Sequence, residues 1–172
     1  MSLVIEDGTS VDNAVSYVTV AEVEAYCTSR NLSAWIDEDD DEVKEQAIMR
    51  AMDYIESLNF KGDKADFENT LEWPRIGWYP RGGNYGFLYT TSNYDAMIPT
   101  GLKYAVCRAA YEEINDPGCL QVTLEKSDFI KRQKIDVVET EYELNAPKAV
   151  YPAIEAHLKG LLRGNDAMVM RT

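Results

Sequence analysis

The chain has 172 residues, of which 45% are hydrophobic and 27% charged, and its formal net charge at pH 7 is -13. This length predicts one domain over residues 1–172, large enough to bury a hydrophobic core. Because an acidic surface repels phosphate backbones and anionic lipid heads, the charge argues against DNA affinity in the free chain and against a membrane partner.

Residues 1–18 are predicted to form an extended N-terminal arm, followed over residues 19–118 by three helices. Thr19 and Glu22 have the spacing of a capping box, so the first helix is expected over residues 20–30. Trp35 and Ile36 follow it and are expected to fill the core between the first two helices.

The acidic run 37–42 raises the question of a calcium loop, because Asp37, Asp39 and Asp41 alternate as EF-hand ligands do. The rest of that motif fails, since Glu42 stands where glycine is needed and Ile48 where a bidentate glutamate is needed. Carboxylates favour the positive N-terminal end of a helix, so the run indicates a solvated helix start, and no metal site is expected.

The second helix, from Lys44, carries one apolar stripe at helical spacing. Gly62 lies just beyond its end, where a residue with positive φ commonly caps a helix. The Trp73-Pro74 pair then predicts an extended elbow, because the residue before proline is pushed out of the α region. The structural core is expected to include Ile48, Ala51, Tyr54, Ile55, Trp73 and Pro74.

Residues 77–98 form a long loop rich in aromatic residues and glycine, and loops of such length tend to be functional. Its aromatic residues could stack bases, as in single-strand binders, but Arg75 and Arg81 alone are basic in this stretch. The same residue types are enriched in protein–protein hot spots, so contact with a protein partner is preferred. The predicted partner-binding residues here are Trp78, Tyr79, Arg81, Tyr85, Phe87 and Tyr89.

A third helix is predicted after Pro99, ending at Asp116-Pro117-Gly118. Residues 121–144 change to a β-branched, partly alternating pattern that predicts an extended hairpin or arm. Its basic cluster allows a DNA contact, although neighbouring acidic residues dilute the charge. The cluster consists of Lys126, Lys131, Arg132 and Lys134, and Ile130, Lys131 and Arg132 are predicted to bind a partner.

The last helix is expected within residues 150–163, from about Pro152, and the tail 164–172 is short with apolar residues. Two alternatives are open for this tail, fraying or insertion into a groove on a partner, and the predicted partner-binding residues in it are Met168, Val169, Met170 and Arg171. The fold class is therefore predicted as mainly α, an antiparallel helical bundle of about four helices with a long loop and an extended β-hairpin or arm.

No pattern of catalytic residues emerges from the chain. There is no G-x-S-x-G sequence, no Walker loop and no pair of histidine ligands, and His157 is the only histidine. Cys27, Cys107 and Cys119 have no C-x-x-C spacing, which favours free thiols in a reducing cytoplasm. The first residues lack the basic and apolar regions of a signal peptide. The chain is expected to be no enzyme and to use no cofactor.

Several blocks resemble a known family. They are Arg50-Ala51-x-Asp53-Tyr54-Ile55, Lys61-Gly62, Leu71-x-Trp73-Pro74-Arg75, Ile98-Pro99, Lys103-x-Ala105-Val106-Cys107 and Tyr151-Pro152, spread over residues 14–162. This pattern resembles the DnaT-like phage proteins, which in turn resemble the head-tail adaptor proteins of tailed bacteriophages.

The two resemblances imply different functions. The adaptor resemblance implies a structural virion protein, a head-tail connector subunit that forms a twelve-fold ring in the neck and binds the portal and a tail or neck completion protein. Acidic ring walls would let DNA pass without tight binding, so this reading is preferred, with a virion location after synthesis in the host cytoplasm. The alternative is a DnaT-like single-stranded DNA-binding protein that uses Tyr85, Phe87, Tyr89 and the Lys126–Lys134 cluster.

Overall fold

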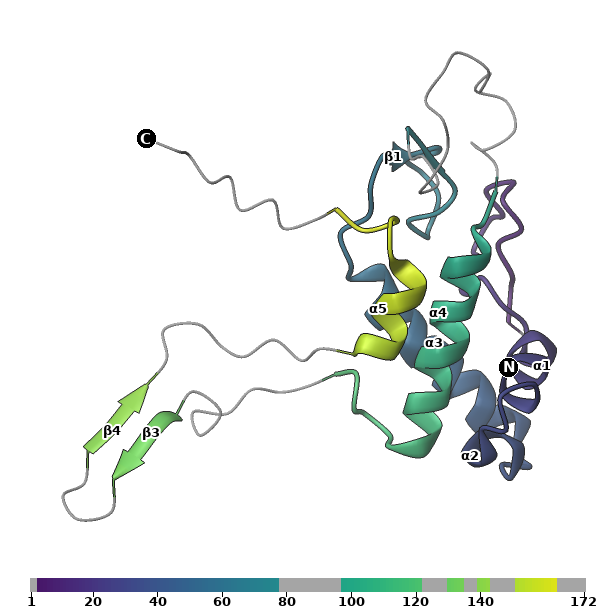
Figure 1. Ribbon diagram of the computed structural model, residues 1–172. Helices are drawn as coiled ribbons and strands as arrows, with labels where there is room; N and C mark the ends of the chain where they lie inside the picture. The colour runs from purple at the N-terminus through teal and green to yellow at the C-terminus, as the bar shows by residue number, and fades with distance from the viewer. Residues whose placement is uncertain (1–2, 78–96, 122–129, 135–138, 143–150, 164–172) are drawn as a thin grey trace, which may run out of the picture.

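The computed structural model describes residues 3–77, 97–121, 130–134, 139–142 and 151–163 (Figure 1). Its regular structure is mainly helical, which confirms the predicted class. The helices are α1 (Val20–Thr28), α2 (Ser33–Ile36), α3 (Asp41–Glu56), α4 (Thr100–Asn115) and α5 (Pro152–Leu158). The strands are β1 (Asp63–Lys64), β2 (Arg75–Ile76), β3 (Ile130–Lys134) and β4 (Glu139–Tyr142).

Short-range signals set the helix starts. The Thr19 side chain accepts a hydrogen bond from the Glu22 N–H, and the Glu22 carboxylate accepts one from the Thr19 N–H, so the capping box is present. Asp40, within the acidic run 37–42, caps α3 through its side chain at the N–H of Glu42. Pro99 precedes α4 as its N-cap residue. The short α2, between the first two predicted helices, was not predicted.

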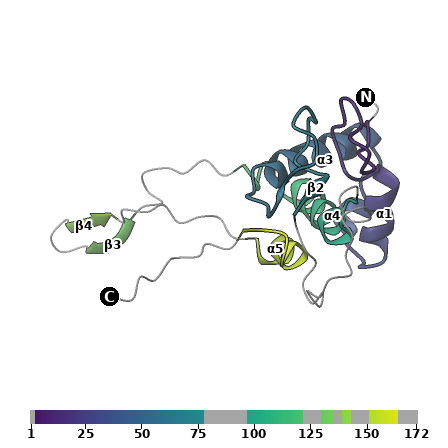
Figure 2. The same cartoon turned by 90° about the horizontal axis from the view of Figure 1, so that it is seen from above.

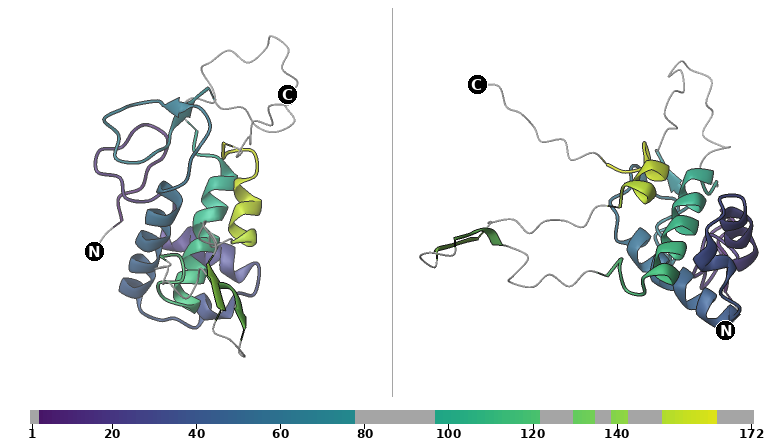
Figure 3. Two further views of the ribbon diagram at one scale, coloured as in Figure 1. Left: turned by 90° about the vertical axis from the view of Figure 1, so that its left-hand side faces the viewer. Right: turned by 60° about the horizontal axis from the view of Figure 1, so that its bottom comes forward.

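Helix α4 is the centre of the packing. It packs most extensively against α3 and α5, and also contacts α1. Figure 3 shows α4 between α5 and α1, and Figure 2 shows the same helices along another direction. The facing sides of α3 and α4 carry fully buried small residues, which let the two helices approach closely; these are Ala47, Ala51, Ala105, Ala109 and Ala110.

A glycine lets α5 lie directly on α4. A Cβ atom at Gly101 would be 2.6 Å from the backbone oxygen of His157 and 3.9 Å from Leu161 Cδ1. Helix α5 ends at Leu158, earlier than the predicted Arg163, and Gly160 follows with φ 98°. The chain then turns back, and Phe60 forms an isolated antiparallel bridge with Leu162.

Residues 3–18 differ from the predicted extended arm. They fold back on themselves through a bridge between Ile5 and Ser16, and Tyr17 and Val18 are fully buried. The buried Glu6 carboxylate accepts hydrogen bonds from the N–H groups of Gly8, Ser10 and Val11, at 2.8 to 3.0 Å. The Ile5–Ser16 bridge and the hydrogen bonds of the Glu6 carboxylate set this shape.

The residues predicted as structural core lie where the helices meet the 59–77 segment. Ile48, Ala51, Ile55, Trp73 and Pro74 are buried, and Tyr54 is partly buried. Gly62 has the expected positive φ of 73°, but it does not cap α3, since Ser57 holds that place in the αR conformation. Trp35 is fully buried, whereas Ile36 is exposed.

Strands β3 and β4 pair antiparallel inside the predicted 121–144 range and lie apart from the helices (Figures 1 and 2). Their register places Arg132 opposite Glu141 and Lys134 opposite Glu139, with a shift between Ile130 and Arg132. Each of these two basic positions therefore has an acidic position as its cross-strand neighbour. Within the described ranges, no helix is both long and apolar enough to span a membrane.

Candidate functional site

The positive side chains of this acidic chain differ in whether they have an acidic partner. Ten lysines and arginines have described side chains, and seven of them form ion pairs with carboxylates. Arg30, Lys61 and Lys159 are exposed and form no ion pair with another described residue. A cation without an acidic partner keeps its full charge for an external anion, so these three residues are candidates for contact with an anionic ligand.

Arg30 lies on an aromatic surface formed by α1, α4 and α5. Its guanidinium carbon is 3.7 Å from the ring centroid of Tyr26 and 5.3 Å from that of Tyr104. The rings of Tyr26 and Tyr104 have centroids 5.4 Å apart. His157 completes the group, with its ring centroid 5.8 Å from Tyr104 and its Nε2 3.1 Å from the Tyr26 hydroxyl. We call Tyr26, Arg30, Tyr104 and His157 the Tyr104 platform.

The platform has a buried member, Tyr26, and an exposed member, Tyr104. Tyr26 is 5% exposed, whereas Tyr104 is 40% exposed and so presents part of its ring to solvent. Arg30 is held by hydrogen bonds from its Nη1 to the Tyr26 carbonyl and the Ser29 hydroxyl, at 3.2 and 2.8 Å. A ring fixed by packing beside a fixed cation can stack a planar group and contact an anion next to it.

The ionisable groups of the platform lie in a positive local field. Burial lowers the pKa of His157, and the guanidinium groups of Arg30 and Arg108 lower it further. Burial raises the pKa of Tyr26, an effect that the same two arginines oppose. The positive charges of Arg30 and Arg108 therefore lower the pKa values of both His157 and Tyr26, although the net charge of the whole chain is negative.

Arg108 continues the surface along α4. It is four residues after Tyr104, and its guanidinium carbon lies 4.9 Å from the ring centroid of Tyr111. Arg108 also pairs with Glu112 at 2.6 Å, so its charge is partly neutralised. One side of α4 carries Tyr104, Arg108 and Tyr111, which are spaced by four and three residues. This side therefore presents an aromatic ring, a cation and a second aromatic ring along about 10 Å of the helix.

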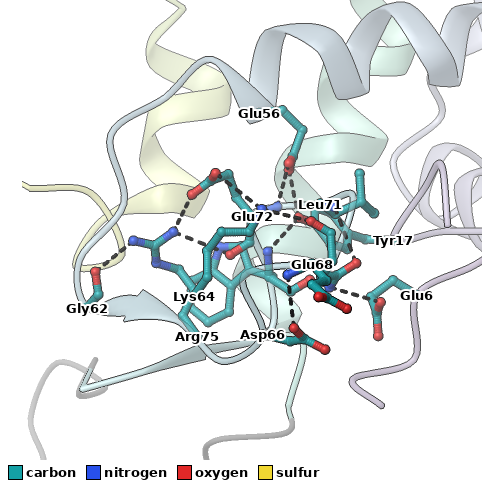
Figure 4. Close-up of polar contacts among 12 residues, drawn as sticks. Glu6, Tyr17, Glu56, Gly62, Lys64, Asp66, Glu68, Leu71, Glu72 and Arg75 are labelled. Carbon is teal, nitrogen blue, oxygen red and sulfur yellow. Dashed lines mark hydrogen bonds and ion pairs between the residues drawn. The ribbon is translucent and has the colours of Figure 1, made fainter. Parts of the chain in front are cut away.

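A second polar cluster joins Tyr17, Glu56, Glu72 and Arg75 (Figure 4). The buried Tyr17 hydroxyl donates to Glu56 Oε1 at 2.6 Å and accepts from the Trp73 N–H at 3.0 Å. Glu56 Oε2 accepts from the Glu72 N–H at 2.6 Å. Burial raises the pKa of both Tyr17 and Glu56. These bonds join the N-terminal segment, α3 and the 59–77 segment.

The guanidinium group of Arg75 forms its hydrogen bonds within the same cluster. Its guanidinium donates to the carbonyls of Lys61, Gly62 and Glu72, at 2.9, 2.7 and 3.3 Å, and also to the Glu72 carboxylate. Lys64 adds a contact to Glu72 at 3.8 Å. With its side chain 8% exposed and its donors engaged, Arg75 fixes the 59–77 segment and is unavailable to an external phosphate.

The substitution Tyr17→Phe tests this structural role. It leaves the buried Glu56 carboxylate without one donor and the Trp73 N–H without its acceptor, so we expect a loss of about 1–3 kcal/mol in the free energy of unfolding. Urea unfolding followed by circular dichroism measures it. The matched control is Tyr54→Phe, which removes a phenol hydroxyl that forms no hydrogen bond with another described residue, and which should change stability by less than about 0.5 kcal/mol. Equal effects of the two substitutions would contradict the role of the cluster.

Most of the predicted partner-binding residues lie outside the described residues. These are Trp78, Tyr79, Arg81, Tyr85, Phe87, Tyr89, Met168, Val169, Met170 and Arg171. Ile130, Lys131 and Arg132 belong to β3, where the register places Arg132 opposite Glu141. Ile130, Lys131 and Arg132, the predicted residues that the structure describes, are not members of the Tyr104 platform.

Sequence analysis missed the residues of the platform, although a signal was present. Tyr26 and Arg30 are four residues apart, as are Tyr104 and Arg108, and such pairs are neighbours on a helix. What it lacked was the contact between the pairs, because Tyr26 and His157 are 131 residues apart.

A family model described as "Putative DnaT-like ssDNA binding protein" matches residues 1–172. No curated protein and no solved structure matches the chain. The prediction of a head-tail connector in a ring with portal and tail partners is therefore wrong, because the whole chain matches a family described by single-strand binding. The prediction inferred low DNA affinity from the net charge of the chain, whereas the affinity of a ligand depends on the charges close to its binding site. The virion location remains an untested prediction.

Proposed function

Since the chain belongs to the family of DnaT-like single-stranded DNA-binding proteins, we propose that it binds single-stranded DNA at the Tyr104 platform. An unpaired base stacks on the exposed part of the Tyr104 ring, and the adjacent phosphate contacts Arg30. Binding proceeds without catalysis, and the described residues hold no group of three or more metal-binding side chains.

The observation that carries the proposal is the position of Arg30. It is an exposed cation with no ion pair to a described residue, and its guanidinium lies over two aromatic rings, one of them 40% exposed. Proteins that bind single strands without sequence preference combine stacking aromatic side chains with cations that follow the backbone. The platform supplies both elements in one rigid group.

The net charge of -13 limits affinity rather than excluding it. Many of the carboxylates lie elsewhere, in the acidic run before α3 and in the loop around Phe67. Long-range repulsion by these charges is screened over about 8 Å at physiological salt, whereas a direct contact with Arg30 is not. The proposal therefore predicts modest affinity that depends strongly on salt.

A finer description of the fold accompanies this proposal. The helices act as an antiparallel bundle that holds Tyr26, Tyr104 and His157 in register, and β3 and β4 act as a separate hairpin. Packing of α1, α3 and α5 around α4 and the antiparallel pairing of β3 with β4 support this arrangement.

Fluorescence anisotropy with a labelled oligothymidylate and with a duplex of equal length tests the function. We expect the single strand to bind more tightly, because paired and stacked bases do not offer their faces to Tyr104. Affinity should fall as salt rises, with a slope of about -0.7 per phosphate contact for single strands. Absence of single-strand binding at low salt, or preference for the duplex, would overturn the proposal.

A charge-reversal variant separates the platform from the alternative site on β3. In the triple substitution Lys131→Glu, Arg132→Glu and Lys134→Glu, we expect most of the affinity to remain, because the β3–β4 register already matches Arg132 and Lys134 with glutamates. Complete loss of binding, with the helical circular dichroism signal unchanged, would place the interface on β3.

A further inference from the structure

Resting on the proposed function, we infer that a second cationic group anchors the phosphate backbone of the same strand. This group consists of Lys61, Lys159 and Arg163, and we call it the α5 turn group. A bound single strand would then extend from the Tyr104 platform past the end of α5, and the α5 turn group would set the length of DNA that the protein covers.

The α5 turn group is held by backbone bonds between two segments distant in sequence. The Lys61 N–H donates to the Leu161 carbonyl at 2.8 Å, and the Arg163 N–H donates to the Asn59 carbonyl at 2.9 Å. These bonds flank the bridge between Phe60 and Leu162, so Lys61 and Arg163 sit on a short antiparallel ladder. A cation on a fixed backbone loses less entropy on binding than one on a free loop.

All three side chains are exposed, and their charges are largely available. Lys61 and Lys159 form no side-chain hydrogen bond or ion pair with another described residue. Arg163 donates to the Gly62 carbonyl at 3.2 Å and lies 4.0 Å from Asp63, with both side chains more than half exposed, at 53% and 78%. An exposed pair at that distance contributes little and can be exchanged for a phosphate contact.

The α5 turn group continues directly from the platform. His157 belongs to the platform, and Lys159 follows it by two residues at the C-terminal end of α5. Leu161, whose carbonyl binds the Lys61 N–H, approaches α4 at Gly101, three residues before Tyr104. Arg30, Lys61 and Lys159, the described cations that form no ion pair with a described residue, are thus linked in series through the Tyr26–His157 contact, the two-residue step along α5 and the Lys61–Leu161 backbone hydrogen bond. Such a series is what a strand that passes over several residues requires.

The test compares oligothymidylates that increase in length from about 4 to 12 nucleotides. The variant carries Lys61→Gln, Lys159→Gln and Arg163→Gln. The control carries the same change in net charge on exposed residues elsewhere, Ser33→Asp, Gln46→Glu and Asn115→Asp. Anisotropy gives the affinity and its salt slope for each length, and thermal unfolding checks that both proteins fold as the parent does.

For the parent protein and the control, we expect affinity to rise with length until the strand reaches the α5 turn group. In the variant, affinity for the shortest strand should be retained while the gain with length disappears, and the salt slope for long strands should fall by about 0.7 for each lost phosphate contact. A variant that keeps the parent's length dependence and slope would overturn this inference and leave the platform in place. Absence of binding by the parent at every length would instead overturn the proposed function.

Discussion

Replacing Tyr104 by alanine is expected to weaken binding of an oligothymidylate by about 1–3 kcal/mol, or roughly 5- to 150-fold in the dissociation constant. The substitution removes the exposed ring of the platform and, with it, a surface on which a base stacks. Tyr104 is 40% exposed, and its neighbours Tyr26 and His157 belong to α1 and α5. Stability should therefore change much less than affinity, as thermal unfolding would show.

Two matched substitutions separate stacking from other effects. Tyr104→Phe keeps the ring and should retain affinity, since no hydrogen bond of the Tyr104 hydroxyl enters the proposal. Phe67→Ala removes an aromatic side chain from a residue that is 86% exposed but lies between Asp66 and Glu68, and it should leave binding unchanged. Equal losses of affinity in Phe67→Ala and Tyr104→Ala would contradict stacking of the base on Tyr104.

The largest loss of stability is expected for Glu113→Ala, about 3–5 kcal/mol in the free energy of unfolding. The Glu113 side chain is fully buried, and its carboxylate pairs with Arg50 Nε at 2.7 Å. It also accepts hydrogen bonds from the N–H groups of Gly118 and Leu120, at 2.9 and 3.1 Å. Without it, the turn after α4 loses its acceptor and Arg50 on α3 loses its partner. Urea unfolding monitored by circular dichroism measures the change.

The same residue gives a pH dependence with a defined sign. Burial alone would raise the pKa of Glu113, but the hydrogen bonds from Gly118, Arg50 and Leu120 outweigh it and leave the pKa lowered. A carboxylate with a lowered pKa in the folded state stabilises the protein above its unfolded pKa, and this stabilisation is lost as pH falls through the folded pKa. The acid side of the stability curve should therefore be shallower in Glu113→Ala than in the parent protein.

The neighbouring residue provides the control for Glu113. Glu112 pairs with Arg108 on the same helix, at positions i and i+4, and both side chains are 24% exposed. Because water reaches this pair, Glu112→Ala should cost less than about 1 kcal/mol. If Glu113→Ala lowered the free energy of unfolding no more than Glu112→Ala does, the buried Glu113 carboxylate would not stabilise the turn after α4.

A consequence for function follows from where the arginines are used. Arg50 and Arg75 belong to blocks that resemble the DnaT-like phage proteins, yet both are engaged inside the fold, with Glu113 and with the 59–77 segment. The conspicuous motif residues thus build the scaffold. Arg30, which lies outside those blocks, and Tyr104, which occupies the unspecified position of the Lys103-x-Ala105-Val106-Cys107 block, have the exposure that a ligand needs.

The sequence by itself determined that the chain is mainly helical and where α1 and α4 start; it placed the start of α3 at Lys44 instead of Asp41, and it did not reveal α2. The Thr19–Glu22 capping box, the Asp40 cap and the start of α4 after Pro99 each depend on residues within about four positions, and the apolar stripes of α3 and α4 identify the faces that meet. Such signals are local, so they can be predicted before any packing is known.

Only the tertiary structure decided which charges are paired and which rings meet. Residues 3–18 fold back through the bridge from Ile5 to Ser16, and Tyr26, Tyr104 and His157 come together from three helices. Net charge is a sum over the sequence and contains no positions, so it suggested a chain that repels DNA. The local field depends on distances, and among the described residues the neighbours of Arg30 are the aromatic side chains of Tyr26 and Tyr104, with no carboxylate in ion-pair contact.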